Sequence, residues 1–128
     1  MRRQSAAVAA FALGLLPLGV ASPRSAGCAS AGPSLAGHYY LQGVMEVGSE
    51  LLLKADGRFQ YMLAYGALDE LASGCWARHG GVVTLFANKF EISMEDPIKF
   101  NRLDLTISSD GKLIRRFDAR HIGAYTHS

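Results

Sequence analysis

Apolar and polar residues alternate in short runs along most of the chain after residue 38, and glycine-containing turns separate the runs. Alternation with a period of two is typical of β-strands that bury one face. No comparable stretch of this region has a helical period. The sequence therefore predicts seven strands, at residues 39–45, 50–54, 58–65, 73–78, 82–87, 102–108 and 112–118.

The same hairpin pattern occurs twice, at residues 51–61 and 103–115. Each copy has an alternating run, an Asp-Gly turn, a basic residue and a second run, which is a strong hairpin signal. A two-residue loop would place an apolar face opposite a polar one, whereas a three-residue loop ending in a left-handed glycine keeps the apolar faces together. We therefore predict three-residue loops at 55–57 and 109–111.

This register pairs apolar positions inside the sheet and charged positions outside it. The predicted pairs are Leu53 with Phe59, Leu51 with Tyr61, Lys54 with Arg58, Ile107 with Leu113, Leu103 with Phe117, and Asp104 with Arg116.

Two segments do not follow the alternation. Residues 66–72 have room for a helical turn, and we expect a long exposed loop there that carries Asp69 and Glu70. Residues 88–101 are predicted to be irregular, because Pro97 excludes a central strand. Phe90, Ile92 and Met94 nevertheless alternate well enough for an edge strand.

An open sheet of this size would leave one face without cover, so it must close. The sequence predicts an all-β fold in which an antiparallel meander closes into a barrel of 7–8 strands within one domain, residues 32–128, with a β-sandwich as the alternative. Such a barrel is either filled or holds one small ligand, and bulky interior residues favour a filled one. The expected interior residues are Leu51, Leu53, Phe59, Tyr61, Leu63, Trp76, Leu85, Leu103, Leu105, Ile107, Leu113 and Phe117.

The first residues have a different pattern: a basic start, an apolar run at 6–21 and then small residues. The run contains Pro17 and is shorter than the roughly 20 residues that span a membrane. We interpret residues 1–31 as a secretory signal peptide with its cleavage region, so the protein is expected in the periplasm or outside the cell. Cleavage after Ala21 and cleavage after Ala31 both remain open.

The fate of the two cysteines depends on that cleavage. If it follows Ala21, Cys28 and Cys75 both remain and are able to form a disulfide in an oxidising compartment. Residues 25–28 also resemble the end of a bacterial lipoprotein signal, so the alternatives are lipidation of Cys28 in an outer-membrane lipoprotein or removal of Cys28 by cleavage after Ala31. Either alternative leaves Cys75 as a small buried hydrophobe, and only lipidation would bring the protein to a membrane.

Net charge argues against a nucleic-acid partner. The whole chain is +2, but three of its 13 basic residues and none of its 11 acidic residues precede Gly32, which leaves −1 from there onward. A near-neutral domain is not typical of phosphate binding. A small basic cluster near the C-terminal end is interpreted as a solvated edge strand. Its members are Arg115, Arg116, Arg120 and His121.

Part of the chain, residues 51–85, resembles the lipocalin-like β-meanders of small exported bacterial proteins. The resemblance rests on Leu-x-Leu-x-x-Asp-Gly-x-Phe at 51–59, on Gly-Cys-Trp at 74–76 and on the glycine turn and apolar strand that follow. Copper-responsive envelope lipoproteins share this style, but their C-x-x-C is missing here. Residues 39–46 and 65–69 are similar to segments of uncharacterised exported proteins of Gram-negative bacteria, a group that offers no activity to transfer.

No motif indicates an enzyme. The four histidines lack the spacing of metal ligands, and there is no nucleophile elbow, P-loop or dinucleotide fingerprint. Asp69, Glu70 and His79 are the candidate acids and base, but adjacent acids rarely converge on one substrate. We therefore expect no catalytic residue, no metal site and no cofactor.

The predicted loop 65–72 is the best candidate for a binding segment, since binding residues concentrate on loops of rigid scaffolds. Tyr65 and Asp69 from this loop, with Tyr61 and Trp76 nearby, would form a pocket for a small apolar or sugar-like ligand, unless the aromatic residues are simply core. The predicted function is a non-catalytic, exported cell-envelope module that binds a small ligand or a protein partner. The alternatives are a lipid-anchored structural or assembly factor and a small hydrolase or isomerase.

Overall fold

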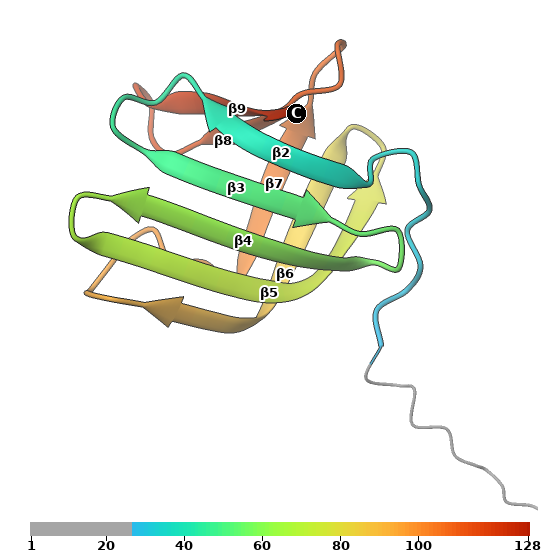
Figure 1. Cartoon of the computed structure of the whole chain (residues 1–128). Helices are drawn as coiled ribbons and strands as arrows, with labels where there is room; N and C mark the ends of the chain where they lie inside the picture. Colours follow the sequence, from blue (N-terminus) through green and yellow to red (C-terminus); the bar gives the residue numbers. More distant parts are fainter. Residues whose placement is uncertain (1–26) are drawn as a thin grey trace, which may run out of the picture.

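The structure is a closed β-barrel (Figure 1). The computed structural model describes residues 27–128, so most of the predicted signal peptide lies outside the described residues. Each strand pairs antiparallel with the next, and β9 pairs back with β2, which confirms the predicted barrel rather than the sandwich. Its strands are β2 (Gly37–Gln42), β3 (Gly48–Leu53), β4 (Arg58–Tyr65), β5 (Leu68–His79), β6 (Val82–Ile92), β7 (Arg102–Ile107), β8 (Leu113–Arg116) and β9 (Ile122–His127). Within residues 27–128, no helix is long and apolar enough to cross a membrane.

Both Asp-Gly hairpins have the predicted three-residue loops. Leu53 lies opposite Phe59 in the β3–β4 ladder, and Ile107 lies opposite Leu113 in the β7–β8 ladder. The Lys54 amide donates to the Arg58 carbonyl at 2.9 Å, and the equivalent bond from Ser108 to Lys112 is 2.8 Å. Gly57 and Gly111 close the loops with φ values of 91° and 85°, which favour glycine.

The second hairpin is shorter than predicted. The β7–β8 ladder consists of Thr106–Ile114 and Ile107–Leu113, so the predicted pairs of Leu103 with Phe117 and Asp104 with Arg116 do not form. The chain leaves this ladder after Ile114, and beyond Arg116 it turns toward β9, where the Phe117 amide donates to the His121 carbonyl at 2.8 Å.

The predicted loop at residues 66–72 is wrong. Tyr65 pairs with Leu68 across a two-residue turn, and β5 continues without interruption from there to His79. The alternation was missed because one of its inward positions is charged. Glu70 faces inward, as do Ala72 and Trp76. The segment is therefore strand, and Glu70 belongs to the barrel interior.

In the predicted irregular region 88–101, β6 continues to Ile92 and pairs there with β5 alone, which confirms the edge strand that the alternation of Phe90 and Ile92 allowed. A bulge in the β5–β6 register lies between Ser73 and Gly74. A Cβ on Gly74 would overlap the Phe86 carbonyl oxygen, so the two strands approach closely only because this residue is glycine.

The strand β9, which closes the barrel between β8 and β2, is not among the predicted strands. Consequently β8 is not an edge strand, and the interpretation of its arginines as a solvated edge is wrong for Arg115, which is 2% exposed. Arg116, Arg120 and His121 are exposed.

The barrel core is the predicted one. Of the twelve expected interior residues, nine are buried and the other three, Leu103, Ile107 and Phe117, pack half-buried against them. Residues that had no predicted place join the core from β2 and β9, namely Tyr39, Leu41 and Tyr125.

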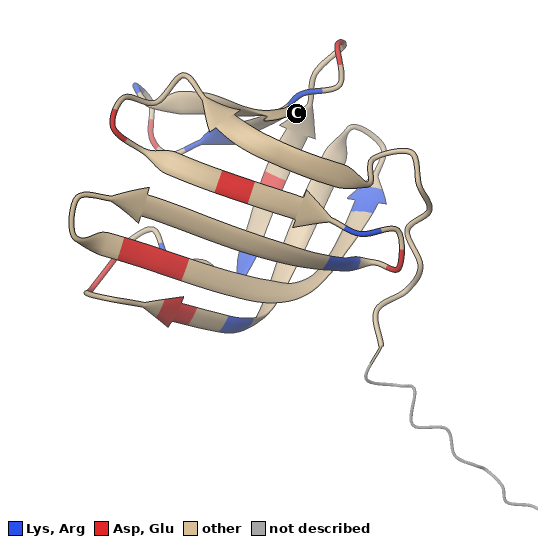
Figure 2. Ribbon diagram, viewed as in Figure 1, with Lys and Arg blue, Asp and Glu red and all other residues tan. Residues whose placement is uncertain are grey.

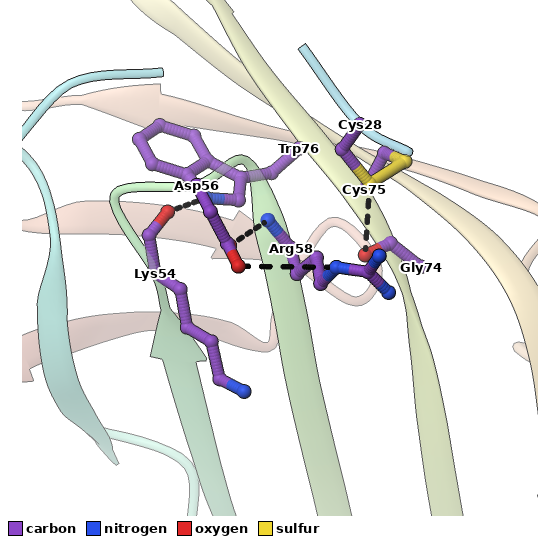
Figure 3. The surroundings of a disulfide bond; sticks show 7 residues. All are labelled: Cys28, Lys54, Asp56, Arg58, Gly74, Cys75 and Trp76. Carbon is purple, nitrogen blue, oxygen red and sulfur yellow. Dashed lines mark hydrogen bonds and ion pairs between the residues drawn. A yellow bond between two sulfur atoms is a disulfide. The ribbon is translucent and has the colours of Figure 1, made fainter. Parts of the chain in front are cut away.

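The segment before β2 covers one end of the barrel, and a disulfide between Cys28 and Cys75 fixes it to β5 (Figure 3). Leu35 is buried in the core, and its carbonyl accepts a 2.7 Å hydrogen bond from the Tyr39 hydroxyl. Beside the disulfide, Trp76 Nε1 donates to the Lys54 carbonyl at 2.8 Å (Figure 3). Cys28 and Cys75 are thus paired with each other.

The two loop glycines provide a matched test of this end of the barrel. Both have positive φ, but a Cβ on Gly57 would overlap the Ala29 carbonyl oxygen, whereas a Cβ on Gly111 meets nothing within 4 Å. We expect Gly111→Ala to lower the free energy of unfolding by about 1–2 kcal/mol, the cost of the left-handed conformation. Gly57→Ala should cost clearly more in urea unfolding. Equal losses would show that the segment around Ala29 does not lie against this loop.

Removal of the disulfide is expected to lower the free energy of unfolding by about 2–5 kcal/mol. The bond joins residues 47 apart, so its loss returns considerable freedom to the unfolded chain. Urea unfolding of the protein with and without dithiothreitol measures the change. The double variant Cys28→Ser/Cys75→Ser is the control and should not respond to the reductant. Identical oxidised and reduced midpoints would contradict the pairing.

Candidate ligand-binding site

At the end opposite the disulfide, four loops surround a pocket in the mouth of the barrel. They are the β2–β3, β4–β5, β6–β7 and β8–β9 loops, which an up-and-down meander places at one end (Figure 1). The cavity volume is about 310 Å³. We call it the mouth pocket, and it is lined by Val44, Met45, Val47, Leu63, Tyr65, Leu68, Asp96, Ile98, Phe117, Asp118 and His121.

The wall of the mouth pocket is mainly apolar, and its outer part is open to solvent. Met45 is 85% exposed and Tyr65 is 52% exposed, although both are large hydrophobic residues. Between Met45 and Val47, Glu46 has a φ of 64°, a strained conformation for a residue other than glycine. Exposed apolar groups gathered around a concave site are typical of binding surfaces.

A second depression, of about 350 Å³, lies at the covered end beside the β7–β8 loop. Its lining includes only two large hydrophobic side chains, Leu35 and Tyr39, among mostly polar or small residues. The mouth pocket, with its apolar wall and few polar groups, is the better candidate for small-molecule binding.

The polar residues of the mouth pocket come from two neighbouring loops. In the β6–β7 loop, Asp96 Oδ1 accepts the Ile98 amide at 3.0 Å, which fixes the carboxyl group within its own turn. In the β8–β9 loop, Asp118 accepts the amides of Arg120 and His121 at 2.8 and 2.9 Å and the imidazole of His121 at 2.8 Å. The Arg120 amide and then the His121 side chain lower the pKa of Asp118, so its carboxylate charge is retained.

Beneath the pocket floor, five side chains form what we call the interior polar cluster, Ser49, Tyr61, Glu70, Arg115 and Tyr125. The Tyr61 hydroxyl donates to Glu70 Oε1 at 2.7 Å and accepts from Arg115 Nη1 at 3.0 Å. Arg115 Nη1 also reaches the Tyr125 hydroxyl at 3.3 Å, which is 2.7 Å from Ser49 Oγ. Through Tyr61 and Tyr125, the Arg115 guanidinium thereby links β8 to four other strands.

The floor itself consists of Leu63 and Phe117, which line the mouth pocket and lie beside members of the interior polar cluster. The Phe117 ring lies over the Arg115 guanidinium at 4.1 Å, a cation–π contact in a buried setting. Leu63 lies opposite Glu70 in the β4–β5 ladder. The mouth pocket is therefore separated from the charged interior by one layer of apolar side chains.

Burial dominates the electrostatics of the interior polar cluster. It raises the pKa of Tyr61 far above its usual value, and the nearby Arg115 charge only partly opposes this. Burial by itself would lower the pKa of Arg115, but the Tyr125 and Tyr61 oxygens raise it overall, so the guanidinium stays charged.

Three buried polar atoms have no hydrogen-bond partner among residues 27–128: Glu70 Oε2, Asp96 Oδ2 and Arg115 Nε. A buried unpaired polar atom is costly, and such atoms usually face a water, an ion or a ligand. Asp96 is the one of the three that lines the mouth pocket.

The structure does not gather the four predicted binding residues at one place. Tyr65 lines the mouth pocket, but Tyr61 is buried beneath the floor in the interior polar cluster. Asp69 is exposed on β5, where its amide bonds to Ser93 Oγ at 2.8 Å. Trp76 is buried at the covered end beside the disulfide.

The candidate acids and base also lie apart. Glu70 points inward and Asp69 outward, while His79 is nine residues beyond Glu70, near the other end of β5. These three side chains form no catalytic group. In the described part of the chain, no group of three or more His, Cys, Asp or Glu side chains is arranged to hold a metal ion.

Sequence reasoning missed Asp96, Asp118 and His121, because nothing in a sequence places two separate loops side by side. It also missed Arg115, although a signal was present. Leu113 and Phe117 were both expected inside the barrel, and the period of two requires the residue midway between them to face the same way.

No known protein family, curated protein or solved structure was found to match this chain. The geometry of the mouth pocket therefore carries the functional argument.

The raised pKa of Tyr61 predicts a loss of stability at alkaline pH. Above about pH 10 the unfolded chain ionises this phenol, whereas the folded protein keeps it neutral. The contribution of Tyr61 to the free energy of unfolding is therefore constant below about pH 10 and decreases above it. The fall is at most about 1.4 kcal/mol per pH unit for one tyrosine. Tyr61→Phe, measured by urea unfolding from pH 7 to 11, should cost about 1–3 kcal/mol at neutral pH, and less as the pH rises.

The exposed Tyr65 provides the control, as Tyr65→Phe removes a hydroxyl outside the core. It measures the effect of losing a tyrosine hydroxyl that the core does not hold. A Tyr61→Phe difference that is constant from pH 7 to 11 would contradict the burial of a neutral phenol.

Proposed function

We propose that this protein is a non-catalytic, exported cell-envelope module that binds a small molecule with an apolar body in the mouth pocket. The observation that carries the proposal is the pocket itself: about 310 Å³, with an apolar wall and three polar side chains. Small-molecule sites are typically concave, mostly apolar and about 300–1,000 Å³ in volume, with a few polar groups that orient the ligand.

The barrel supports this use of its open end. Its interior is filled by core side chains and by the interior polar cluster, so a ligand would lie at the mouth rather than deep inside. The opposite end is held by a disulfide and by buried Leu35. A rigid scaffold that carries a pocket between loops is a common arrangement for binding.

The disulfide supports export. A bond between Cys28 and Cys75 requires an oxidising compartment such as the periplasm or the extracellular space. We infer signal cleavage after Ala21, since that site retains Cys28, whereas cleavage after Ala31 would remove it. The same bond disfavours the lipid-anchored alternative, because a thioether at Cys28 would occupy the same sulfur atom. The resemblance of residues 51–85 to exported lipocalin-like meanders agrees with this proposal.

An uncharged fluorescent probe, N-phenyl-1-naphthylamine, tests the pocket directly. We expect saturable binding at one site with increased fluorescence. Val47 lies half-buried in the β2–β3 loop and lines the pocket, so Val47→Trp should fill it and weaken binding at least tenfold, about 1.4 kcal/mol.

The matched control is Val82→Trp, the same substitution at a half-buried valine at the start of β6, next to the covered end. It should leave probe affinity within twofold of the wild-type value. Absence of saturable binding, or an equal loss in both variants, would overturn the proposal in favour of a surface that contacts a protein partner.

A further inference from the structure

The mouth pocket is asymmetric in its chemistry. Its carboxyl groups, Asp96 and Asp118, come from the β6–β7 and β8–β9 loops, whereas the β2–β3 and β4–β5 loops contribute only apolar or aromatic side chains. Acidic residues are present in three of the four loops at this end (red in Figure 2). No lysine or arginine lines the pocket in the described part of the chain. A ligand that fills it therefore meets an apolar wall on one side and two negative groups on the other.

Asp96 is the residue that most clearly lacks a partner. It is only 9% exposed, its Oδ1 is occupied by the Ile98 amide, and its Oδ2 has no hydrogen-bond donor among residues 27–128. The turn fixes the carboxyl group, so it cannot rotate freely into solvent to find one. A ligand that places a donor at Oδ2 would remove the cost of this unpaired atom.

An anionic ligand fits the site poorly. The nearest buried cation is Arg115, but the Phe117 ring covers its guanidinium at 4.1 Å and two tyrosine hydroxyls occupy its Nη1. His121, the remaining basic group of the pocket, is already paired with Asp118 at 2.8 Å. An incoming carboxylate or phosphate would meet both aspartates within the pocket lining, to which Lys99 and Arg120 of the same loops do not contribute.

We propose that the mouth pocket binds a small organic cation, an amine with an aliphatic or aromatic body. The ammonium group donates to Asp96 Oδ2, with Asp118 as a second negative group. The body lies against Val47, Leu63 and Phe117. This inference rests on the proposed function, since it names the class of ligand for the same pocket. Because the pocket combines negative charge with apolar area, it favours amines with an apolar body over uncharged apolar molecules and over polar cations.

Three probes with one alkyl chain and different head groups test the charge. Octylamine, octanol and octanoate are titrated into the disulfide-bonded protein at neutral pH by calorimetry. We expect octylamine to bind at least tenfold more tightly than octanol, and octanoate to bind more weakly than either. Octanoate as the tightest probe, or equal affinity for all three, would overturn the cationic class while leaving the proposed function intact.

The role of Asp96 is tested with Asp96→Asn, which keeps an oxygen to accept the Ile98 amide. It should reduce the preference for octylamine over octanol about tenfold and leave octanol affinity nearly unchanged. The adjacent Glu95→Gln removes the same charge from an exposed residue outside the pocket lining and should change neither affinity. An unchanged amine preference in Asp96→Asn would contradict the assigned contact.

Two further measurements separate the possible failures. If Asp96→Asn unfolds, which thermal melting shows, then Asp118→Asn replaces it and should reduce the amine preference by a smaller factor. If N-phenyl-1-naphthylamine does not bind the wild-type protein saturably, the proposed function fails and this inference fails with it. Binding of the uncharged probe without amine preference removes this inference alone.

Discussion

The pairing of β9 with β2 is the constraint on which the rest of this structure depends. It removes the edges of the sheet, so no strand is left with unpaired backbone groups along a whole side. It also fixes a narrow interior, because eight strands enclose a space that side chains largely fill. Every inward position must then be apolar or have polar partners inside the barrel. Closure therefore turns Arg115 from a surface residue on an edge strand into a buried charge.

The interior polar cluster is how the protein meets that requirement. Among residues 27–128, no carboxylate forms an ion pair with Arg115. Two tyrosine hydroxyls accept its hydrogen bonds, the Phe117 ring lies over its guanidinium, and the Tyr61 hydroxyl donates in turn to Glu70. Because the members depend on one another, loss of a single partner leaves a buried donor or acceptor and costs more than replacement of the whole set by apolar groups. The cluster thus ties β3, β4, β5, β8 and β9 into one arrangement directly beneath the pocket floor.

The sequence was informative where local rules decide the structure. The two Asp-Gly loops and the inward faces of β3 and β4 follow from turn geometry and the period of two, and they are as expected. The sequence was misleading at Asp69 and Glu70. Two adjacent charged residues suggested a loop, but the closed barrel buries Glu70. β9 left no signal, since Gly123 and the polar residues near it weaken its alternation. The candidate site could not be predicted without β9, because the position of Asp118 and His121 depends on that strand.

The topology also explains why the repeated hairpin carries no binding residue. In an up-and-down barrel, successive connections alternate between the two ends, so the loops at 55–57 and 109–111 share the covered end with the disulfide. There the close approach of Gly57 to Ala29 and the burial of Leu35 require tight packing and leave little freedom. The β2–β3, β4–β5, β6–β7 and β8–β9 connections share the other end, where exposed hydrophobic side chains and Asp96 Oδ2, which has no hydrogen-bond partner among residues 27–128, are tolerated. The covered end stabilises the fold, and the open end is therefore the one available for the proposed binding.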